Sequence, residues 1–227
     1  MSKSLSPENL YHFNIHQFIK NALAEDMGGG DHTSLACIPA SAKGKTQLLV
    51  KQKGIVAGVE LALLIFKEVD KSLKVKVEIK DGQKIKKGDI VLTVEGSSRS
   101  ILLAERLVLN CMQRMSGIAT YTHELVKLCK GTDCKVIDTR KTTPTIRGLE
   151  KWAVVIGGGA NHRIGLYDMI LIKDNHVDYA GGIKEAIESA NAYLRKKKKK
   201  LKIEVETRSL DEVKQAFEEF YNGNFIK

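Results

Sequence analysis

The sequence predicts an α/β protein in two parts: a mixed layer of strands and helices, followed by parallel strands that helices connect. Between residues 46 and 96, stretches that alternate apolar and polar residues surround one helical stretch. After residue 130, strand patterns and helix patterns alternate, which is typical of parallel strands with crossover helices. We therefore predict a domain boundary near Ser116, with domains 1–115 and 116–227.

The composition is that of an ordinary globular protein. Of its 227 residues, 43% are hydrophobic and 28% are charged. The longest apolar run, 61–66, is far shorter than the ~18 residues of a membrane span, and the N-terminal stretch lacks the apolar core of a signal peptide. The four cysteines form no CxxC pair, so we expect reduced thiols in a cytoplasmic protein with no membrane partner.

Most of the net charge of +10 comes from one segment. Seven positive charges lie within eight residues, at Arg195, Lys196–Lys200 and Lys202. The run lies between a helix pattern and a strand pattern, so we expect a solvated loop. A nucleic-acid site is the alternative, but no aromatic residues that could stack on bases are interleaved with the run. We therefore expect no nucleic-acid partner.

The first helix is expected to begin at the pair Ser6-Pro7 and to continue through apolar residues at helical spacing. These residues are Ile15, Phe18, Ile19, Ala22 and Leu23. A triple glycine at 28–30 follows them. Such a triplet can cradle a phosphate, but here it follows a helix rather than a strand, so we interpret it as a helix stop and a loop.

The region from Thr46 to Gly96 is expected to form a sheet with one helix. Apolar residues at 73, 75, 77 and 79 alternate with charged residues, and further strands are expected at 48–50 and 90–94. A helix at about 59–69 interrupts them, and one sheet face should be solvated. A helix at 100–115 follows; Ser116-Gly117 is expected to break it before a second helix that runs to about Leu128.

After residue 130 we expect three units of strand and helix. The strands are Lys135–Asp138, Met169–Ile172 and Lys202–Glu206. The helices start at Thr143-Pro144, at about Gly182, and after Ser209, which forms a capping-box pattern with Glu212. Three strands cannot close a barrel, so we expect another chain or more of the polypeptide to cover the open sheet edge.

Charged residues stand where each of these strands ends. The first strand is followed by Arg140 and Lys141, within the stretch Asp-Thr-Arg-Lys-Thr-Thr-Pro at 138–144. The other positions are Lys173, Asp174 and His176 after the second strand, Glu204, Glu206 and Arg208 at the third, and His162 and Arg163 after the glycine-rich turn 157–159. One charged strand end is equally well explained by a rim salt bridge. Three in one sheet favour a site, because ligands bind at the carboxyl ends of such strands.

The balance of charges at these strand ends predicts the ligand chemistry. Cations outnumber carboxylates, and guanidinium groups bind carboxylates and phosphates through paired hydrogen bonds. The site should therefore bind a polyanionic substrate. Glu206, with Glu204 as a second candidate, would hold a sugar hydroxyl or Mg²⁺, which takes one or two protein carboxylates together with substrate phosphates. No His and Cys spacing supports another kind of metal site.

Five stretches together resemble the quinolinate phosphoribosyltransferase family. They are GDHTS, LAERLVLNCMQRMSGIAT, DTRKTTP, GGGANHRIGLYDMILIKDNH and IEVET, in order between about Ile15 and Phe217. The resemblance implies an N-terminal α/β sandwich domain followed by an open α/β barrel with parallel strands, here incomplete. It also implies a homodimer, or a hexamer of dimers, in which each site borrows residues from the partner subunit.

The resemblance also implies a reaction and roles for named residues. Enzymes of this family, which are pentosyltransferases, join quinolinate to phosphoribosyl pyrophosphate with Mg²⁺, release pyrophosphate and CO₂, and form nicotinate mononucleotide for NAD synthesis. By motif, the clamp for the quinolinate carboxylates consists of Arg140, His162, Arg163 and Lys173, with Lys141 nearby. Arg106 resembles the arginine supplied across the dimer. Glu206 resembles the carboxylate that serves the ribose and Mg²⁺. We predict Lys141 and Glu206 as catalytic, with Lys141 stabilising the anion that decarboxylation leaves.

The chain departs from the family pattern at its C-terminal end. The family continues through a strand that ends in Leu-Asp-Asn and through glycine-rich loops that hold the ribose 5′-phosphate, whereas this sequence ends in FEEFYNGNFIK. We therefore expect a C-terminally shortened family member. The alternative is a catalytically impaired or non-catalytic fragment that retains dimerisation and dicarboxylate binding.

Overall fold

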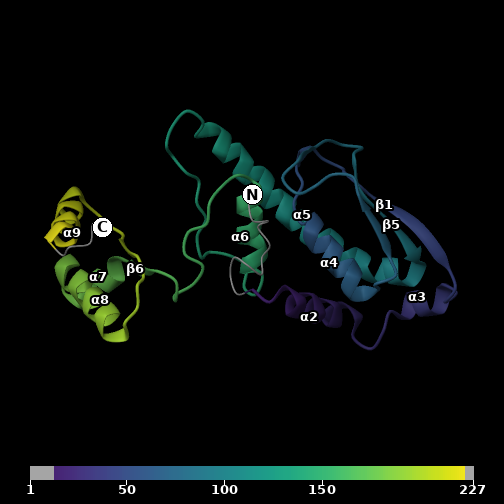
Figure 1. Cartoon of the computed structure of the whole chain (residues 1–227), viewed down its shortest axis with the longest axis horizontal. Coiled ribbons are helices and arrows are strands. Elements are labelled where there is room, and N and C mark those ends of the chain that lie inside the picture. The colour runs from purple at the N-terminus through teal and green to yellow at the C-terminus, as the bar shows by residue number, and fades with distance from the viewer. Residues whose placement is uncertain (1–12, 223–227) are drawn as a thin grey trace. The chain divides into compact units, whose positions relative to one another are not determined.

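The computed structural model describes residues 13–222, so the helix start predicted at Ser6-Pro7 lies outside the described residues. The chain divides into two compact units, Met1–His162 (unit 1) and Arg163–Lys227 (unit 2). Both contain helices and strands, which confirms the predicted mixed α/β class (Figure 1). Among the described helices, none combines the length and the apolar character that crossing a membrane requires.

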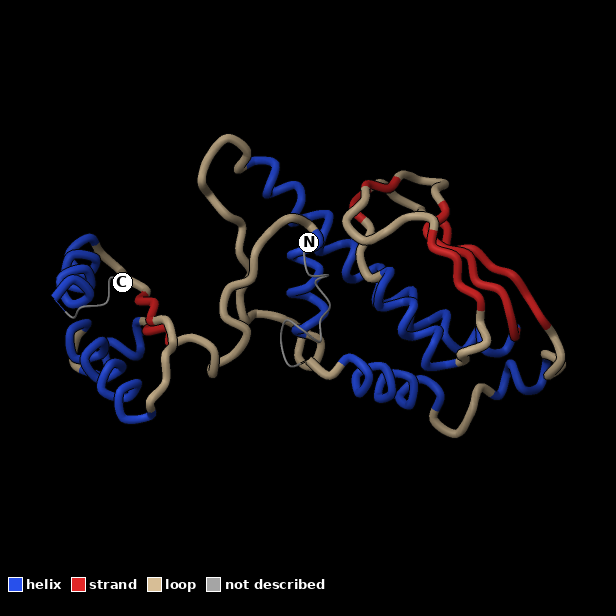
Figure 2. The backbone as a smooth tube through the Cα atoms, viewed as in Figure 1, coloured by secondary structure: helices blue, strands red, loops and turns tan. Residues whose placement is uncertain are grey.

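Unit 1 is built on a three-stranded antiparallel sheet with the order β1-β5-β3. The strands are β1 (Lys43–Leu49), β3 (Lys74–Val77) and β5 (Ile90–Ser97); a second, two-stranded sheet pairs β2 (Gly54–Ile55) with β4 (Lys84–Ile85). Helices α4 (Val59–Val69) and α5 (Ser98–Leu128) lie side by side against one face of the larger sheet (Figure 2). Polar side chains such as Lys45, Lys74 and Glu95 line the other face, which confirms the predicted solvated face.

The core of unit 1 lies between this sheet and its helices. Three further helices are α2 (Ile15–Met27), α3 (His32–Cys37), which the sequence did not predict, and α6 (Arg147–Ile156). Residues exposed by 2% or less include Ile15, Ile19, Leu61, Ile65, Val94, Met115 and Trp152. Helix α2 ends at Gly28, whose φ of 48° is left-handed, so the helix stop predicted for the triple glycine is confirmed.

Helix α5 runs without interruption through Ser116 and Gly117, so the predicted helix break is wrong. A glycine within a helix costs only about 1 kcal/mol relative to alanine. Packing outweighs that cost here. The Ser116 hydroxyl accepts a hydrogen bond from the Ala57 N–H (2.9 Å) and donates one to the Ala57 carbonyl (3.2 Å). The residues that suggested a break therefore attach α5 to the segment that follows β2.

The glycine-rich turn 157–159 packs closely against α5. A Cβ atom on Gly157 would lie 2.5 Å from the Ala119 carbonyl oxygen, and one on Gly159 would lie 2.9 Å from a Thr122 methyl group. Real Cβ atoms essentially never come as close as 2.5 Å to another heavy atom. These two glycines therefore allow the chain after α6 to approach the helix.

Two predictions around the stretch 138–144 are wrong. The strand expected at 135–138 is reduced to one parallel bridge between Ile137 and Ala160, and Ile137 is 53% exposed rather than buried. The helix expected from Thr143-Pro144 begins at Arg147 instead. Thr145 has a φ of 68°, which is incompatible with helix, and the backbone N–H of Thr143 is bound by Glu150, so the segment forms a loop.

Unit 2 contains the parallel strands that the sequence predicts. Strands β6 (Ile170–Ile172) and β7 (Ile203–Val205) pair in parallel. Helices α7 (Asp174–Ala180) and α8 (Ile183–Lys197) connect the two strands, and α9 (Leu210–Asn222) follows β7. Their small core comprises Ile172, Val177, Ile183, Ala186, Ile187 and Ala216. The sequence did not predict α7. At α9, the Ser209 hydroxyl accepts the Glu212 N–H (3.2 Å), but the Glu212 carboxylate binds the N–H of Arg208 rather than that of Ser209, so only half of the capping box forms.

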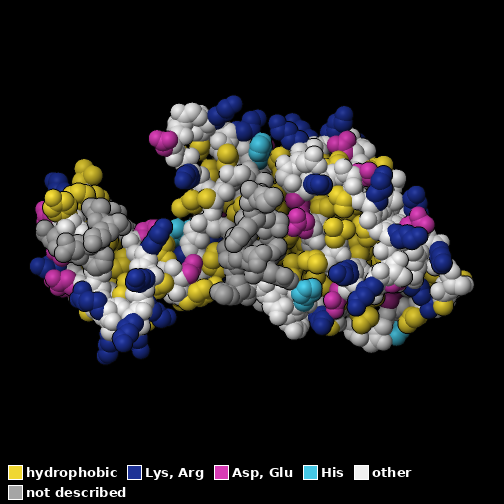
Figure 3. Space-filling view, viewed as in Figure 1, with side chains coloured by type: hydrophobic (Ala, Val, Ile, Leu, Met, Phe, Trp, Pro, Cys, Tyr) yellow, Lys and Arg dark blue, Asp and Glu magenta, His cyan; other side chains and the backbone are white. Residues whose placement is uncertain are grey.

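The lysine run lies at the end of α8 and just after it. Residues 195–200 are all exposed, which confirms a solvated segment, although Arg195–Lys197 belong to the helix rather than to a loop. On the face shown in Figure 3, basic side chains are scattered over unit 1, and several gather at the end of unit 2 where α8 ends.

Candidate active site

The loop 138–144 is anchored at its first residue by a buried ion pair. The Asp138 carboxylate, whose side chain is 7% exposed, pairs with the ammonium group of Lys151, whose side chain is fully buried. The same carboxylate accepts the Asn161 side-chain amide and the His162 N–H (3.0 Å). Lys151 also donates to the His162 carbonyl (3.3 Å). Asp138 therefore links this loop to the segment 161–162 and to α6.

A second buried carboxylate holds the other end of the loop. The Glu150 side chain, 8% exposed, accepts the Thr143 N–H (3.0 Å), the Thr143 hydroxyl (2.9 Å) and the Arg114 guanidinium of α5 (2.6 Å). Burial by itself raises the pKa of Glu150, but the hydrogen bonds from Arg114 and Thr143 outweigh it and leave the pKa below its ordinary value. Glu150 is therefore an ionised anchor at neutral pH.

The middle of the loop carries the two predicted cations. Arg147 donates from Nε to the Thr142 hydroxyl (2.9 Å) and from Nη2 to the Arg140 carbonyl (3.5 Å). Lys141 is exposed, and its N–H binds the Thr139 hydroxyl (3.0 Å). Arg140 is half-buried, and its buried Nε has no hydrogen-bond partner within residues 13–222. A buried donor without a partner is uncommon, which distinguishes Arg140 from the other residues of this loop.

In unit 2, the ends of β6 and β7 bring two predicted residues together. The Lys173 ammonium group lies 2.7 Å from the Glu206 carboxylate, and the two side chains are 41% and 49% exposed. The Glu206 N–H binds the Ile172 carbonyl (2.8 Å), which extends the parallel pairing by one step. The His176 imidazole Nδ1 accepts the Lys173 N–H (2.9 Å) and fixes the start of α7. The pair is therefore open to solvent and to ligands.

The predicted site residues divide between the two units. Arg106 is exposed on α5, and Arg140, Lys141 and His162 lie on or beside the loop 138–144; all four belong to unit 1. Arg163, which is 8% exposed, is the first residue of unit 2. Lys173 and Glu206 form their ion pair in the same unit. Their roles in binding and catalysis stay predictions.

The described residues contain no group of three or more His, Cys, Asp or Glu side chains that could hold a metal ion. Glu206 supplies one carboxylate, and Lys173 binds one of its oxygens. That donor set fits Mg²⁺ only if substrate phosphates complete the coordination, which is the usual arrangement for this ion.

The comparisons with known proteins cover both parts of the chain. The family model for the quinolinate phosphoribosyl transferase N-terminal domain matches residues 31–116, and the model for the C-terminal domain matches residues 118–222. Nicotinate-nucleotide pyrophosphorylase (carboxylating) of Mycobacterium leprae is 41% identical over 198 residues, which cover 86% of this chain and 68% of that protein. The chain belongs to the quinolinate phosphoribosyltransferase family.

Other family members agree with this assignment and with the fold. The mitochondrial quinolinate phosphoribosyltransferase (decarboxylating) 2b of Nicotiana tabacum is 46% identical over 207 residues, covering 91% of this chain and 58% of that one. The solved structure of NadC from Streptococcus pyogenes matches with a TM-score of 0.86 at 38% identity, covering 96% of this chain and 74% of that one. The predicted family and the α/β fold are confirmed. The chain spans less than two thirds of the length of the plant family members.

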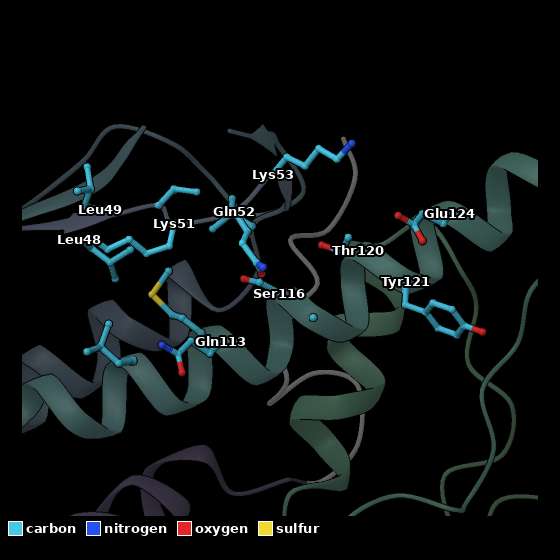
Figure 4. Close-up of a pocket in the computed structure, with 15 residues that line it drawn as sticks. Leu48, Leu49, Lys51, Gln52, Lys53, Gln113, Ser116, Thr120, Tyr121 and Glu124 are labelled. Carbon is cyan, nitrogen blue, oxygen red and sulfur yellow. The ribbon is translucent and has the colours of Figure 1, made fainter. Parts of the chain in front are cut away.

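One groove of unit 1 contains none of the predicted site residues of this family member. A cavity of about 570 Å³ in unit 1 runs along α5 and is walled by the segment 48–53 (Figure 4). Its lining includes Lys51, Lys53, Gln113 and Glu124, and none of the predicted site residues lines it. The groove therefore contains two lysines but no arginine or histidine.

Sequence reasoning missed the residues that support the loop of this family member. These are Arg114, Glu150, Lys151 and Asn161. A signal was present: Glu150 and Lys151 interrupt the apolar stretch 149–155, and all residues of 148–153 are buried. Two adjacent charged residues in an apolar helix predict partners from other segments, because buried charges are rarely left unpaired.

Proposed function

We propose that this chain provides the activity of a quinolinate phosphoribosyltransferase. The reaction joins quinolinate and phosphoribosyl pyrophosphate to give nicotinate mononucleotide, CO₂ and pyrophosphate, a pentosyl transfer in the de novo synthesis of NAD. Family membership supports the proposal. The observation that carries it is Arg140, whose Nε has no partner among residues 13–222. Its loop is held at one end by the buried Asp138–Lys151 pair and at the other by the buried Glu150 carboxylate.

The proposed quinolinate clamp consists of Arg140, His162, Arg163 and Lys173. Quinolinate carries two carboxylates, and charge-assisted hydrogen bonds from guanidinium groups are among the strongest that proteins make. Lys141 is exposed beside Arg140 and can approach the ring position that loses CO₂. There its ammonium group would stabilise the developing anion by charge compensation.

We propose that Glu206 serves the ribose and Mg²⁺. Mg²⁺ would enter bound to the pyrophosphate of the substrate and would help to balance the charge of the departing pyrophosphate. In the structure Lys173 neutralises Glu206, and both side chains are half-exposed, so a substrate carboxylate can draw Lys173 away from Glu206.

We further propose a homodimer in which Arg106 reaches the site of the partner subunit. Its exposed position on α5 supports this role. The cytoplasmic location and the lack of a nucleic-acid partner stay predictions; the names of two plant relatives place those proteins in the mitochondrion and the chloroplast.

The test substitutes the residue on which the proposal depends. Arg140→Gln should weaken quinolinate binding roughly 10- to 150-fold, which corresponds to the loss of about 1.5–3 kcal/mol from hydrogen bonds to a charged group. Calorimetry measures binding, and chromatography measures nicotinate mononucleotide. The control is Arg195→Gln, in the exposed run at the end of α8.

The outcomes separate the proposal from its alternative. Unchanged quinolinate affinity in Arg140→Gln would remove Arg140 from the clamp. If the unsubstituted chain binds quinolinate with high affinity but forms no nicotinate mononucleotide from saturating substrates and Mg²⁺, it is a binding fragment rather than an enzyme.

A further inference from the structure

Three side chains from the first half of α6 bind the loop 138–144. Glu150 binds Thr143 at the far end of the loop, and Lys151 binds Asp138 at the near end. Arg147, one helical turn earlier, binds the Thr142 hydroxyl and the Arg140 carbonyl between them. Because a turn contains 3.6 residues, these three side chains lie within about one turn and a half of the helix. The loop therefore folds around the first half of α6.

We infer that Glu150 and Lys151 are positioning residues, which hold Arg140 and Lys141 in the geometry that binds substrate. The inference rests on the proposed function. Neither side chain is offered to the substrate, since both are buried and fully engaged by the loop, by α5 or by the segment 161–162. Glu150 and Lys151 would act by fixing Arg140 and Lys141, which lie in the chain between Asp138 and Thr143.

The burial of the Asp138–Lys151 pair makes this support stiff. The Lys151 side chain is fully buried and that of Asp138 is 7% exposed, so a shift of the loop would separate two charges where little water can reach them. Such separation is strongly unfavourable. A loop held in its binding geometry loses less conformational freedom when the ligand arrives, which strengthens binding without any added contact.

Stability alone does not explain these charges. A buried ion pair is often no better for stability than apolar side chains of similar volume. What apolar side chains cannot do is fix the direction of a loop through hydrogen bonds at defined atoms, as Glu150 does with the N–H and hydroxyl of Thr143. Arg114 extends the same network to α5 and so relates the loop to the core of unit 1.

The decisive experiment is Glu150→Gln, which keeps the shape and an acceptor oxygen but removes the charge. We expect hydrogen exchange of the 139–146 backbone to accelerate roughly 5- to 10-fold, and KM for quinolinate to rise by a similar factor. We expect KM for phosphoribosyl pyrophosphate to change less than about twofold. Glu25→Gln, an exposed carboxylate on α2, is the matched control.

A second variant protects the test from misfolding. Arg114→Gln removes the counter-charge of Glu150 from a side chain that is 57% exposed, so the fold should tolerate it, and the same two readouts should change in the same direction. Unchanged exchange in 139–146, or an equal rise in both KM values, would overturn the inference. The exchange measurement needs no substrate, so it still tests the support if the chain forms no nicotinate mononucleotide and the proposed function fails.

Discussion

The two units present their charged side chains in different ways. In unit 1, three charged side chains that hold the loop 138–144 are buried: that of Lys151 is fully buried, and those of Asp138 and Glu150 are 7% and 8% exposed. In unit 2, Lys173 and Glu206 form a comparably short pair, yet both remain 41% or more exposed. The same kinds of residue therefore serve fixed geometry in one unit and accessibility in the other.

The difference shows why charge alone is a poor guide to a binding residue. A buried pair cannot exchange its partner for a ligand without a large penalty, whereas an exposed pair can do so at little cost. Within the stretch 138–144, Asp138 and Thr143 hold the loop, whereas Lys141 is exposed and Arg140 is half-buried. Substitutions of Lys151 and Lys173 test this division, and a substitution of Gly157 tests the packing of unit 1.

The largest effect is expected for Lys151→Met. It leaves the Asp138 carboxylate buried without its cation, so unit 1 should lose about 3–5 kcal/mol of stability. Trp152 is the sole tryptophan and is 2% exposed, so its fluorescence during urea unfolding reports unit 1. The double variant Asp138→Asn/Lys151→Met should recover much of the loss. A single-variant loss below about 1 kcal/mol would contradict the buried pair.

An intermediate effect is expected for Gly157→Ala. The new methyl group would meet the Ala119 carbonyl oxygen at 2.5 Å, and such overpacking costs about 1–3 kcal/mol. The matched variant is Gly117→Ala, where the methyl group meets open space on α5 and should stabilise the helix by about 1 kcal/mol. The same fluorescence measurement should give opposite signs, and equal signs would contradict the packing.

The smallest effect on stability is expected for Lys173→Ala in unit 2. Because the pair with Glu206 is half-exposed, its removal should change stability by no more than about 1 kcal/mol. Thermal unfolding followed by circular dichroism measures this change, with Lys184→Ala, whose side chain is 60% exposed, as control. A loss comparable to that of Lys151→Met would abolish the contrast between the units.

The sequence predicts elements well where periodicity is strong and packing agrees with it. The helix expected at about 59–69 is α4, with those bounds, and the alternating stretch after residue 73 is β3. It fails where side chains from distant segments decide. Gly117 does not end α5, because Ser116 binds Ala57, and the helix expected at Thr143-Pro144 is delayed because Glu150 binds Thr143.

The site residues show the same difference between local patterns, which the sequence reveals, and contacts between distant segments, which it does not. The strand-end residues Lys173 and Glu206 were predicted as members of one site, because their types and positions are visible locally, and they lie together. Asp138 and Lys151 were not predicted as partners, because 13 positions separate them and no periodic pattern relates them. The partner of a buried charged residue is determined by the tertiary fold and cannot be found from a local sequence pattern.

Helix α5 has a consequence for dissecting the protein. Its 31 residues form one rod of about 46 Å, at ~1.5 Å per residue, and the two family models meet inside it, at residues 116 and 118. A cut there would divide the rod and separate the Thr120 hydroxyl from the Ile55 N–H (2.9 Å) and Arg114 from Glu150. Expression of separate parts should instead divide the chain between His162 and Arg163, where no helix or strand is severed.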